Sequence, residues 1–360
     1  MDFVITQIYA KSRVLEQYNR LDMKEEVRMK VQELRQLLST ADRERLEKAF
    51  AESYKKFSKQ QKEEVDLIIG DILEGKDTKE ANRKEAVNFE KLEQEITVFI
   101  ENAYAQNYYA PNRIIPKSQR PKWRFLVKNF IKELEKIQPE SENYTTSVKL
   151  LTDLYRLICY ACNVYLFSTD DAFRSIGWEQ SQLFQLLVKK TFGMEYSEEN
   201  ISKLLLLAAT GGLSRESLYV YQELVLLGEL KTADVKYMAI EEAKKLVKER
   251  QEKLKGLGKY DRNRYYLEDA VNELCGIVLM ISVQLAEAET GIPYFFGNCM
   301  ENNKEIVLYR ALDLMNMMDE DDMWIQIYEY GVKKKIKPRE FLQKSYQKRI
   351  NIKMENKNEK

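Results

Sequence analysis

The side chains that most often carry out catalysis are missing or isolated in this sequence. Histidine does not occur among the 360 residues, which excludes Ser-His and Cys-His nucleophilic pairs and histidine metal ligands. No GxxxxGK[ST] phosphate loop is present, and Gly256 and Gly258 supply only two glycines of a GxGxxG turn. We therefore expect a protein that is not an enzyme and that carries no cofactor.

Four cysteines are enough for a tetrahedral zinc site, and Cys159 and Cys162 form a CxxC pair. Zinc-binding CxxC pairs usually lie on tight polar turns, whereas this pair lies in an apolar helical run. Cys275 also begins an apolar run, and Cys299 is the fourth thiol. We interpret the cysteines as core residues and predict no metal site.

An acidic run, residues 319–322, contains carboxylates that could hold Mg²⁺ or share acid and base roles. It falls between two predicted helices, where acidic residues cap and stabilise a helix start. We interpret the run as a cap. An enzyme that uses carboxylates and a metal in a helical cleft is the least favoured hypothesis.

The first basic segment, residues 113–132, has seven cations and no acid. Its cations are Arg113, Lys117, Arg120, Lys122, Arg124, Lys128 and Lys132. Trp123, Phe125 and Phe130 lie among them, and cations interleaved with aromatic rings suit a nucleic-acid backbone and unstacked bases. On a helix, however, Trp123 and Phe130 fall on an inward face, which leaves the cations as an ordinary solvated face. Both interpretations stay open.

The second basic segment, residues 333–353, has Glu340 as its single acid. Its cations are Lys333, Lys334, Lys335, Lys337, Arg339, Lys344, Lys348, Arg349 and Lys353. The spacing of Leu342, Tyr346 and Ile350 predicts a helix with a patchy apolar side. Basic amphipathic helices bind nucleic acid, anionic lipid or acidic proteins, but they also occur as soluble tails.

Tyrosine is frequent, with 22 residues, and a tyrosine ring gives an interface contact area at low entropic cost. Two groups are candidate protein interfaces. The first is Tyr104, Tyr108 and Tyr109, and the second is Tyr260, Tyr265 and Tyr266. The alternative is that these rings are half-buried at helix ends.

The composition favours helices that present solvated faces. Hydrophobic residues make up 44% and charged residues 32%, with only 13 glycines and 6 prolines. Because 58 basic residues cancel 58 acidic ones, attraction to a polyanion must come from a local patch. No apolar stretch reaches the roughly 18 to 20 residues of a transmembrane helix, and we expect a cytoplasmic protein.

Apolar spacing divides the chain into four parts. Residues 1–110 show narrow apolar stripes that predict a helical bundle or hairpins. Residues 111–121 hold Pro111, Pro116 and Pro121, which predict a linker or ordered loop. We expect residues 122–350 to form a helical array and the polar residues 351–360 to form a frayed tail.

In the third part the predicted helices are apolar on more than one side, so they need neighbours on two sides. The predicted ranges are 150–167, 183–192, 201–209, 218–230, 235–254, 265–286, 306–318 and 323–332. The sequence thus predicts an all-α protein with an irregular α-solenoid-like array of antiparallel helices, similar in architecture to HEAT or TPR arrays.

The leading hypothesis is a non-catalytic interaction protein, a scaffold or regulator, that presents a helical surface or groove to a protein partner. The alternative is a nucleic-acid-binding protein that uses the two basic segments, residues 113–132 and 333–353. Architecture alone does not decide between them, and the oligomeric state stays open.

Overall fold

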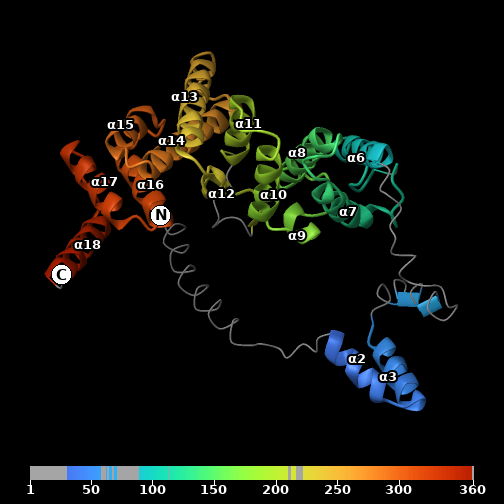
Figure 1. Cartoon of the computed structure of the whole chain (residues 1–360). Helices are drawn as coiled ribbons and strands as arrows, with labels where there is room; N and C mark the ends of the chain where they lie inside the picture. The colour runs from blue at the N-terminus through green and yellow to red at the C-terminus, as the bar shows by residue number, and fades with distance from the viewer. Residues whose placement is uncertain are drawn as a thin grey trace. The chain divides into compact units, whose positions relative to one another are not determined.

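The fold is described from a computed structural model (Figure 1). It describes residues 31–57, 62, 65–66, 69–70, 89–112, 114–209, 212–215 and 222–358. Within these ranges the chain forms fifteen α-helices and one 3-10 helix, and it forms no β-strand. The predicted all-α class is therefore confirmed for this part of the chain.

The chain divides into two compact units, residues 1–86 and 87–360. In the first unit the described helices are α2 (Val31–Thr40) and α3 (Arg43–Lys55). Asp42 caps α3 by accepting a hydrogen bond from the amide of Arg45 at 2.9 Å. Neither Leu37 nor Phe50 is buried. Much of the predicted N-terminal pattern lies outside the described residues.

The second unit begins before the proline segment on which the sequence-based division rests. Its first helix, α6 (Phe89–Tyr104), buries one stripe that includes Ile96 and Phe99 and packs against α8 (Tyr144–Ala161). Residues 111–112 and 114–121 belong to a loop of this unit, in which Arg120 donates a hydrogen bond to the carbonyl of Ile115 at 2.8 Å. The short 3-10 helix η1 (Arg120–Lys122) ends the loop.

The predicted range 150–167 corresponds to α8. The remaining helices of the second unit follow in chain order, and each predicted range between residues 183 and 332 has a counterpart among them. They are α7 (Trp123–Lys136), α9 (Ala172–Ile176), α10 (Gln180–Phe192), α11 (Glu198–Ala208), α12 (Gln222–Glu229), α13 (Ala233–Lys255), α14 (Arg262–Gln284), α15 (Ala288–Asn298), α16 (Lys304–Met317), α17 (Asp321–Lys333) and α18 (Glu340–Asn358).

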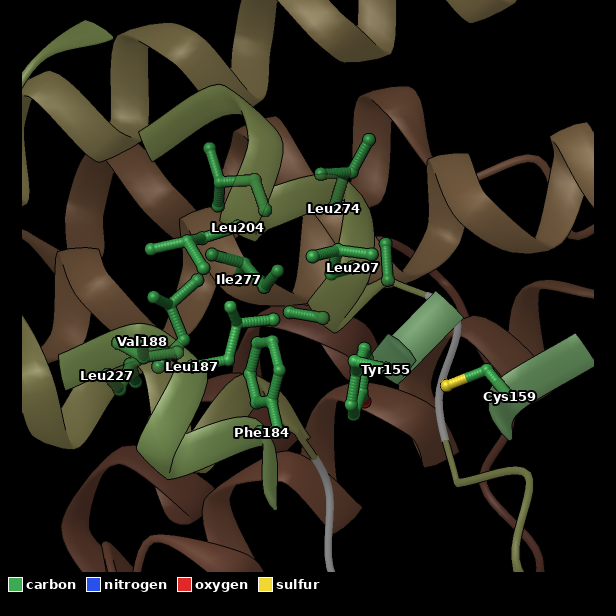
Figure 2. Packing of buried hydrophobic residues seen from close by; sticks show 14 of the residues in the cluster. Tyr155, Cys159, Phe184, Leu187, Val188, Leu204, Leu207, Leu227, Leu274 and Ile277 are labelled. Carbon is green, nitrogen blue, oxygen red and sulfur yellow. The ribbon is translucent and has the colours of Figure 1, made fainter. Parts of the chain in front are cut away.

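One hydrophobic core runs through the second unit. Figure 2 shows part of it, where side chains from α8, α10, α11, α12 and α14 meet. Tyr155 and Phe184 are fully buried there, with ring centroids 5.6 Å apart. Burying a large apolar side chain stabilises a fold by about 1.5–3 kcal/mol, so this shared core holds the helices together.

Helix α14 has a long buried segment in its second half. Its residues from 271 to 283 are nearly all buried, and it packs against α13, α15 and α16. The most apolar run of the sequence, residues 275–286, therefore belongs largely to a core helix, as its composition suggested. Among the described helices, none has the length and apolarity needed to cross a membrane.

Helix α15 was not predicted from the sequence, because Gly291 and Pro293 interrupt its apolar pattern. Gly291 has a packing role. A Cβ atom at this position would lie 2.5 Å from the Cβ atom of Ser282, so glycine permits the close approach of α15 to α14.

The C-terminal residues also differ from expectation. Helix α18 continues through Asn358, whereas the sequence predicted a frayed tail from residue 351. An ion pair of 2.6 Å between Lys353 and Asp322 of α17 holds this part of the helix to the rest of the unit.

The contact between α14 and α15 generates a stability prediction. We expect Gly291→Ala to lower the free energy of unfolding by about 1–3 kcal/mol, because the added methyl group forces the two helices apart. Gly297→Ala in the same helix is the matched control, since its Cβ atom would meet nothing within 4 Å. It should be neutral or stabilising by up to about 1 kcal/mol. Urea unfolding of both variants tests this, and equal stabilities would contradict the packing role.

Candidate interaction surfaces

The connection between α13 and α14, together with the first residues of α14, presents three tyrosines to solvent. We call this segment, residues 256–266, the tyrosine turn. Tyr260 is 90% exposed, Tyr265 68% and Tyr266 71%. The rings of Tyr265 and Tyr266 meet edge to face with centroids 5.9 Å apart. The alternative that these rings are half-buried at helix ends does not apply to this group.

Local hydrogen bonds fix the shape of the tyrosine turn. Asp261 caps α14 by accepting a hydrogen bond from the amide of Asn263 at 2.8 Å. Arg264 donates from Nη1 to the carbonyls of Leu254 and Leu257, at 3.3 and 3.4 Å. Its Nε pairs with Glu268 at 2.8 Å. The exposed tyrosines therefore stand on a backbone that is already ordered.

Cations surround the tyrosine turn. Lys253, Lys259 and Arg262 are exposed, and none of them has an ion pair with an acid of the described chain. The Lys259 ammonium lies over the Tyr260 ring at 5.8 Å from its centroid. The turn thus combines aromatic area with positive charge.

In the other tyrosine group, one ring belongs to the core and two are more accessible. Tyr108 is buried against Phe99 and Phe167, with ring centroids 5.3 and 5.8 Å away. Tyr104 and Tyr109 are more accessible, but each ring pairs with another tyrosine, Tyr160 and Tyr165 respectively. Aromatic packing at the end of α6 accounts for this group.

Apart from Arg113, which lies outside the described residues, the first basic segment lines α7 and the loop before it. Its cations Lys117, Lys122, Arg124, Lys128 and Lys132 are exposed, and Arg120 is half-buried. The structure gives none of these six an ion pair with a described acid. Their charge is therefore available to a ligand.

The aromatic residues of this segment differ in burial. Trp123 and Phe130 are buried, as the helical spacing predicted, while Phe125 is 43% exposed. The Arg124 guanidinium lies over the Phe125 ring at 5.0 Å. Only Phe125 can therefore offer a ring to a ligand at this surface.

Three of the cations form a row that we call the basic stripe. Arg124, Lys128 and Lys132 recur at every fourth residue of α7, which places them on one side of the helix at intervals of about 6 Å. The result is a line of positive charge beside the buried face of α7.

The second basic segment is partly paired within the protein, in contrast to the first. Four of its cations form ion pairs of 2.6–2.9 Å: Arg339 with Glu305, Lys344 with Glu340, Arg349 with Asp321, and Lys353 with Asp322. The cations left without an acid partner among the described residues are Lys333, Lys334, Lys335, Lys337 and Lys348. Ion pairs within the protein therefore offset part of this segment's positive charge.

The acidic run has a different role from the predicted cap. No side chain of the run caps α17, although Asp321 and Asp322 lie in its first turn. Both carboxylates pair with α18 across the helix contact, and Arg349 also stacks over Trp324 at 4.4 Å. An acidic run and a basic segment further along the chain have complementary charge, and this complementarity could have predicted their contact from the sequence.

Two acids that no sequence pattern marked are Glu223 of α12, which is buried, and Glu273 of α14, which is half-buried. With Arg310 and Asp313 they line a cavity of about 100 Å³. One carboxyl oxygen of each has no hydrogen-bond partner in the described structure. The two residues are far apart in sequence and belong to no motif, so only folding brings them together.

Burial determines the protonation of these acids. It raises the pKa of Glu223 to about 7. Burial, followed by the nearby charge of Glu223, raises the pKa of Glu273 to about 9. The pair therefore keeps a proton at neutral pH. In the described residues no three acids or cysteines are grouped so that they could hold a metal ion.

The four cysteines are packed as the apolar context predicted. Cys159, Cys275 and Cys299 are buried, Cys162 is half-buried, and all four thiols are free. Burial raises the pKa of the Cys159 thiol to about 12, which keeps it protonated and unreactive.

The acid pair Glu223 and Glu273 predicts a pH dependence of stability. Between the ordinary glutamate pKa of 4.5 and about 9, the folded state keeps a proton on Glu273 that the unfolded state releases. Raising the pH over this range therefore destabilises the fold. The slope of the unfolding free energy against pH reports how many more protons the folded state binds than the unfolded state. We expect Glu273→Gln to reduce this slope by the equivalent of up to about one proton per molecule between pH 6 and 9.

Chemical unfolding at several pH values measures this effect. Glu289→Gln, an exposed acid on α15, is the matched control and should keep the pH dependence of the unmodified protein. Parallel curves for Glu273→Gln and the unmodified protein would show that Glu273 ionises normally.

The candidate surfaces of the second unit thus differ in their exposure and in how far their charges are paired within the protein. The tyrosine turn is uncovered, the basic stripe lacks acid partners among the described residues, and four of the nine cations of the second basic segment are paired internally. No family model, curated protein or solved structure matches this chain.

Proposed function

We propose that this chain is a non-catalytic interaction protein, a scaffold or regulator, whose protein partner docks on the tyrosine turn. The observation that carries the proposal is the exposure of Tyr260, Tyr265 and Tyr266 on one short turn. Aromatic rings grouped at this exposure leave apolar area in water, which a partner surface can cover.

The energetics of the turn support docking. Interface tyrosines that enter a partner pocket often contribute 2 kcal/mol or more each. The hydrogen bonds of Asp261 and Arg264 order the backbone in advance, so binding loses less conformational entropy. The cations at the rim favour a partner whose apolar pocket has an acidic border.

We also propose that helix pairs of the second unit stack as an irregular solenoid-like array, which presents the turn at the end of a helical hairpin. The packing of α11 on α13 and of α14 on α16, beyond contacts between chain neighbours, supports this arrangement. The four free thiols support a cytoplasmic location for the protein.

Replacing Tyr260, Tyr265 and Tyr266 together by alanine tests the docking proposal. We expect the free energy of unfolding to change by no more than about 0.5 kcal/mol per site, because the rings are exposed. The affinity for the partner should fall at least a hundredfold. A photo-crosslinking amino acid at position 260 identifies that partner in native cells, and its affinity is then measured with purified components.

Tyr165→Ala is the matched control, because Tyr165 is also exposed but lies in the other aromatic group. It should bind the partner with unchanged affinity. An equal loss for Tyr165→Ala and the triple variant, or full affinity of the triple variant, would place the interface elsewhere.

A second candidate function is nucleic-acid binding along the basic stripe. It is favoured by the absence of ion pairs at the described cations of the first basic segment, whose charge is not neutralised within the described chain. Phe125 adds an exposed ring on which a base can stack.

For this candidate we expect that the logarithm of the affinity for a single-stranded oligonucleotide falls linearly with the logarithm of salt concentration. Neutralising Arg124, Lys128 and Lys132 with glutamine should reduce the slope by about 2, because roughly 0.7 counterions are released per contact. Fluorescence anisotropy over a salt series measures the slope.

A double variant of the second basic segment, Lys344→Gln with Lys353→Gln, serves as the control, because both of these cations are already paired. Its slope should match that of the unmodified protein. A flat salt response, or equal effects of the two variants, would exclude the basic stripe as a nucleic-acid surface.

A further inference from the structure

A recess of about 200 Å³ opens where the start of α7 faces the loop between α8 and α9. Its lining includes Arg120 and Arg124 from one side and Ser168, Thr169 and Ser175 from the other. Cations and hydroxyl groups from segments about 50 residues apart thus meet in one place.

The apolar wall of the recess is firmly packed. Trp123 stacks on Phe167 with ring centroids 3.8 Å apart and planes 7° apart, and both side chains are buried. Arg124 follows Trp123 and Ser168 follows Phe167 in the chain. The packing of the two rings therefore fixes the backbone from which the side chains of Arg124 and Ser168 extend.

Arg120 is oriented in advance. Its Nε donates to the carbonyl of Ile115 at 2.8 Å, and its Nη2 donates to the carbonyl of Asn112. A guanidinium has five N–H donors, so three remain without an acceptor in the described chain. A guanidinium held in this way can offer parallel donors to an oxyanion with little loss of side-chain entropy.

Arg124 supplies the second charge. It lies in the first turn of α7, four residues after Arg120, and no described acid forms an ion pair with it. Two guanidinium groups that line one recess repel each other unless an anion lies between them.

The hydroxyl groups of the recess have separate roles. Thr169 Oγ1 and Ser175 Oγ lie 2.8 Å apart, and they lie 3.1 and 2.9 Å from the carbonyl of Asp171 to which they donate. Thr169 and Ser175 therefore hold the loop. Ser168 is exposed, and its hydroxyl makes no such hydrogen bond in the described structure, so it can donate to a ligand.

The recess contains no carboxylate among its lining residues. The two nearest acids of the loop are engaged elsewhere. Asp170 pairs with Arg215 at 2.6 Å, and Asp171 accepts hydrogen bonds from the amides of Arg174 and Arg215 and from the Ser214 hydroxyl. The balance of charge in the recess is positive.

We propose that this recess is a binding site for a phosphate group, in the form of a phosphomonoester. Arg120 and Arg124 donate to the phosphate oxygens, and the Ser168 hydroxyl adds a third donor from the opposite wall. This site is separate from protein docking at the tyrosine turn, and it does not require a nucleic-acid strand along the rest of the basic stripe.

Titration of the full chain with inorganic phosphate and with a nucleoside monophosphate at low ionic strength tests the proposal. We expect saturable binding of both by isothermal titration calorimetry. Arg124→Gln should weaken it at least about tenfold, because a charge-assisted pair is lost. Lys132→Gln, on the same stripe but outside the recess, should change the affinity less than twofold.

Ser168→Ala gives a second test if Arg124→Gln lowers stability, since Ser168 is exposed and its replacement should not disturb the fold. We expect a several-fold loss of phosphate affinity in this variant. Absence of phosphate binding, or equal weakening by Arg124→Gln and Lys132→Gln, would overturn the site and indicate only diffuse attraction. Oligonucleotide binding without phosphate binding would also overturn it, while leaving the basic stripe as a nucleic-acid surface.

Discussion

The burial of α14 over residues 271–283 is the constraint on which the other features of the second unit depend. A helix that is apolar on all sides must be covered on all sides, and α13, α15 and α16 provide that cover. Glycine at position 291 allows α15 to come close enough. The same burial puts Glu273 where its charge is unfavourable, which explains why its carboxyl keeps a proton to about pH 9.

The first turns of α14 have the opposite character, and the contrast matters for function. Residues 262–266 extend past the core, so Tyr265 and Tyr266 have no neighbours to cover them. The long contact between α13 and α14 nevertheless anchors the turn, and Arg264 ties it to the end of α13. A buried helix thus supports an exposed and ordered group of aromatic side chains, which is the arrangement that protein recognition favours.

Charge is distributed unevenly beneath a net charge of zero. In the C-terminal helices, acids of α17 neutralise cations of α18 and join the two helices. Around α7 the cations have no such partners, and two of them meet hydroxyl groups in a recess. Identical residue types therefore stabilise the fold in one place and remain available for a ligand in another.

The sequence by itself determined the all-α class, most of the helices between residues 122 and 350, and the inward positions of Trp123 and Phe130. These features follow from local periodicity, which neighbouring residues encode directly. It did not determine α15, where glycine and proline hide a helix that its contact with α14 requires. Only the tertiary structure decided that Tyr108 is buried while Tyr260 is exposed, that Arg349 is paired while Arg124 is not, and that Glu223 meets Glu273. Each of these outcomes depends on which distant segments pack together, and composition and spacing do not specify such long-range contacts.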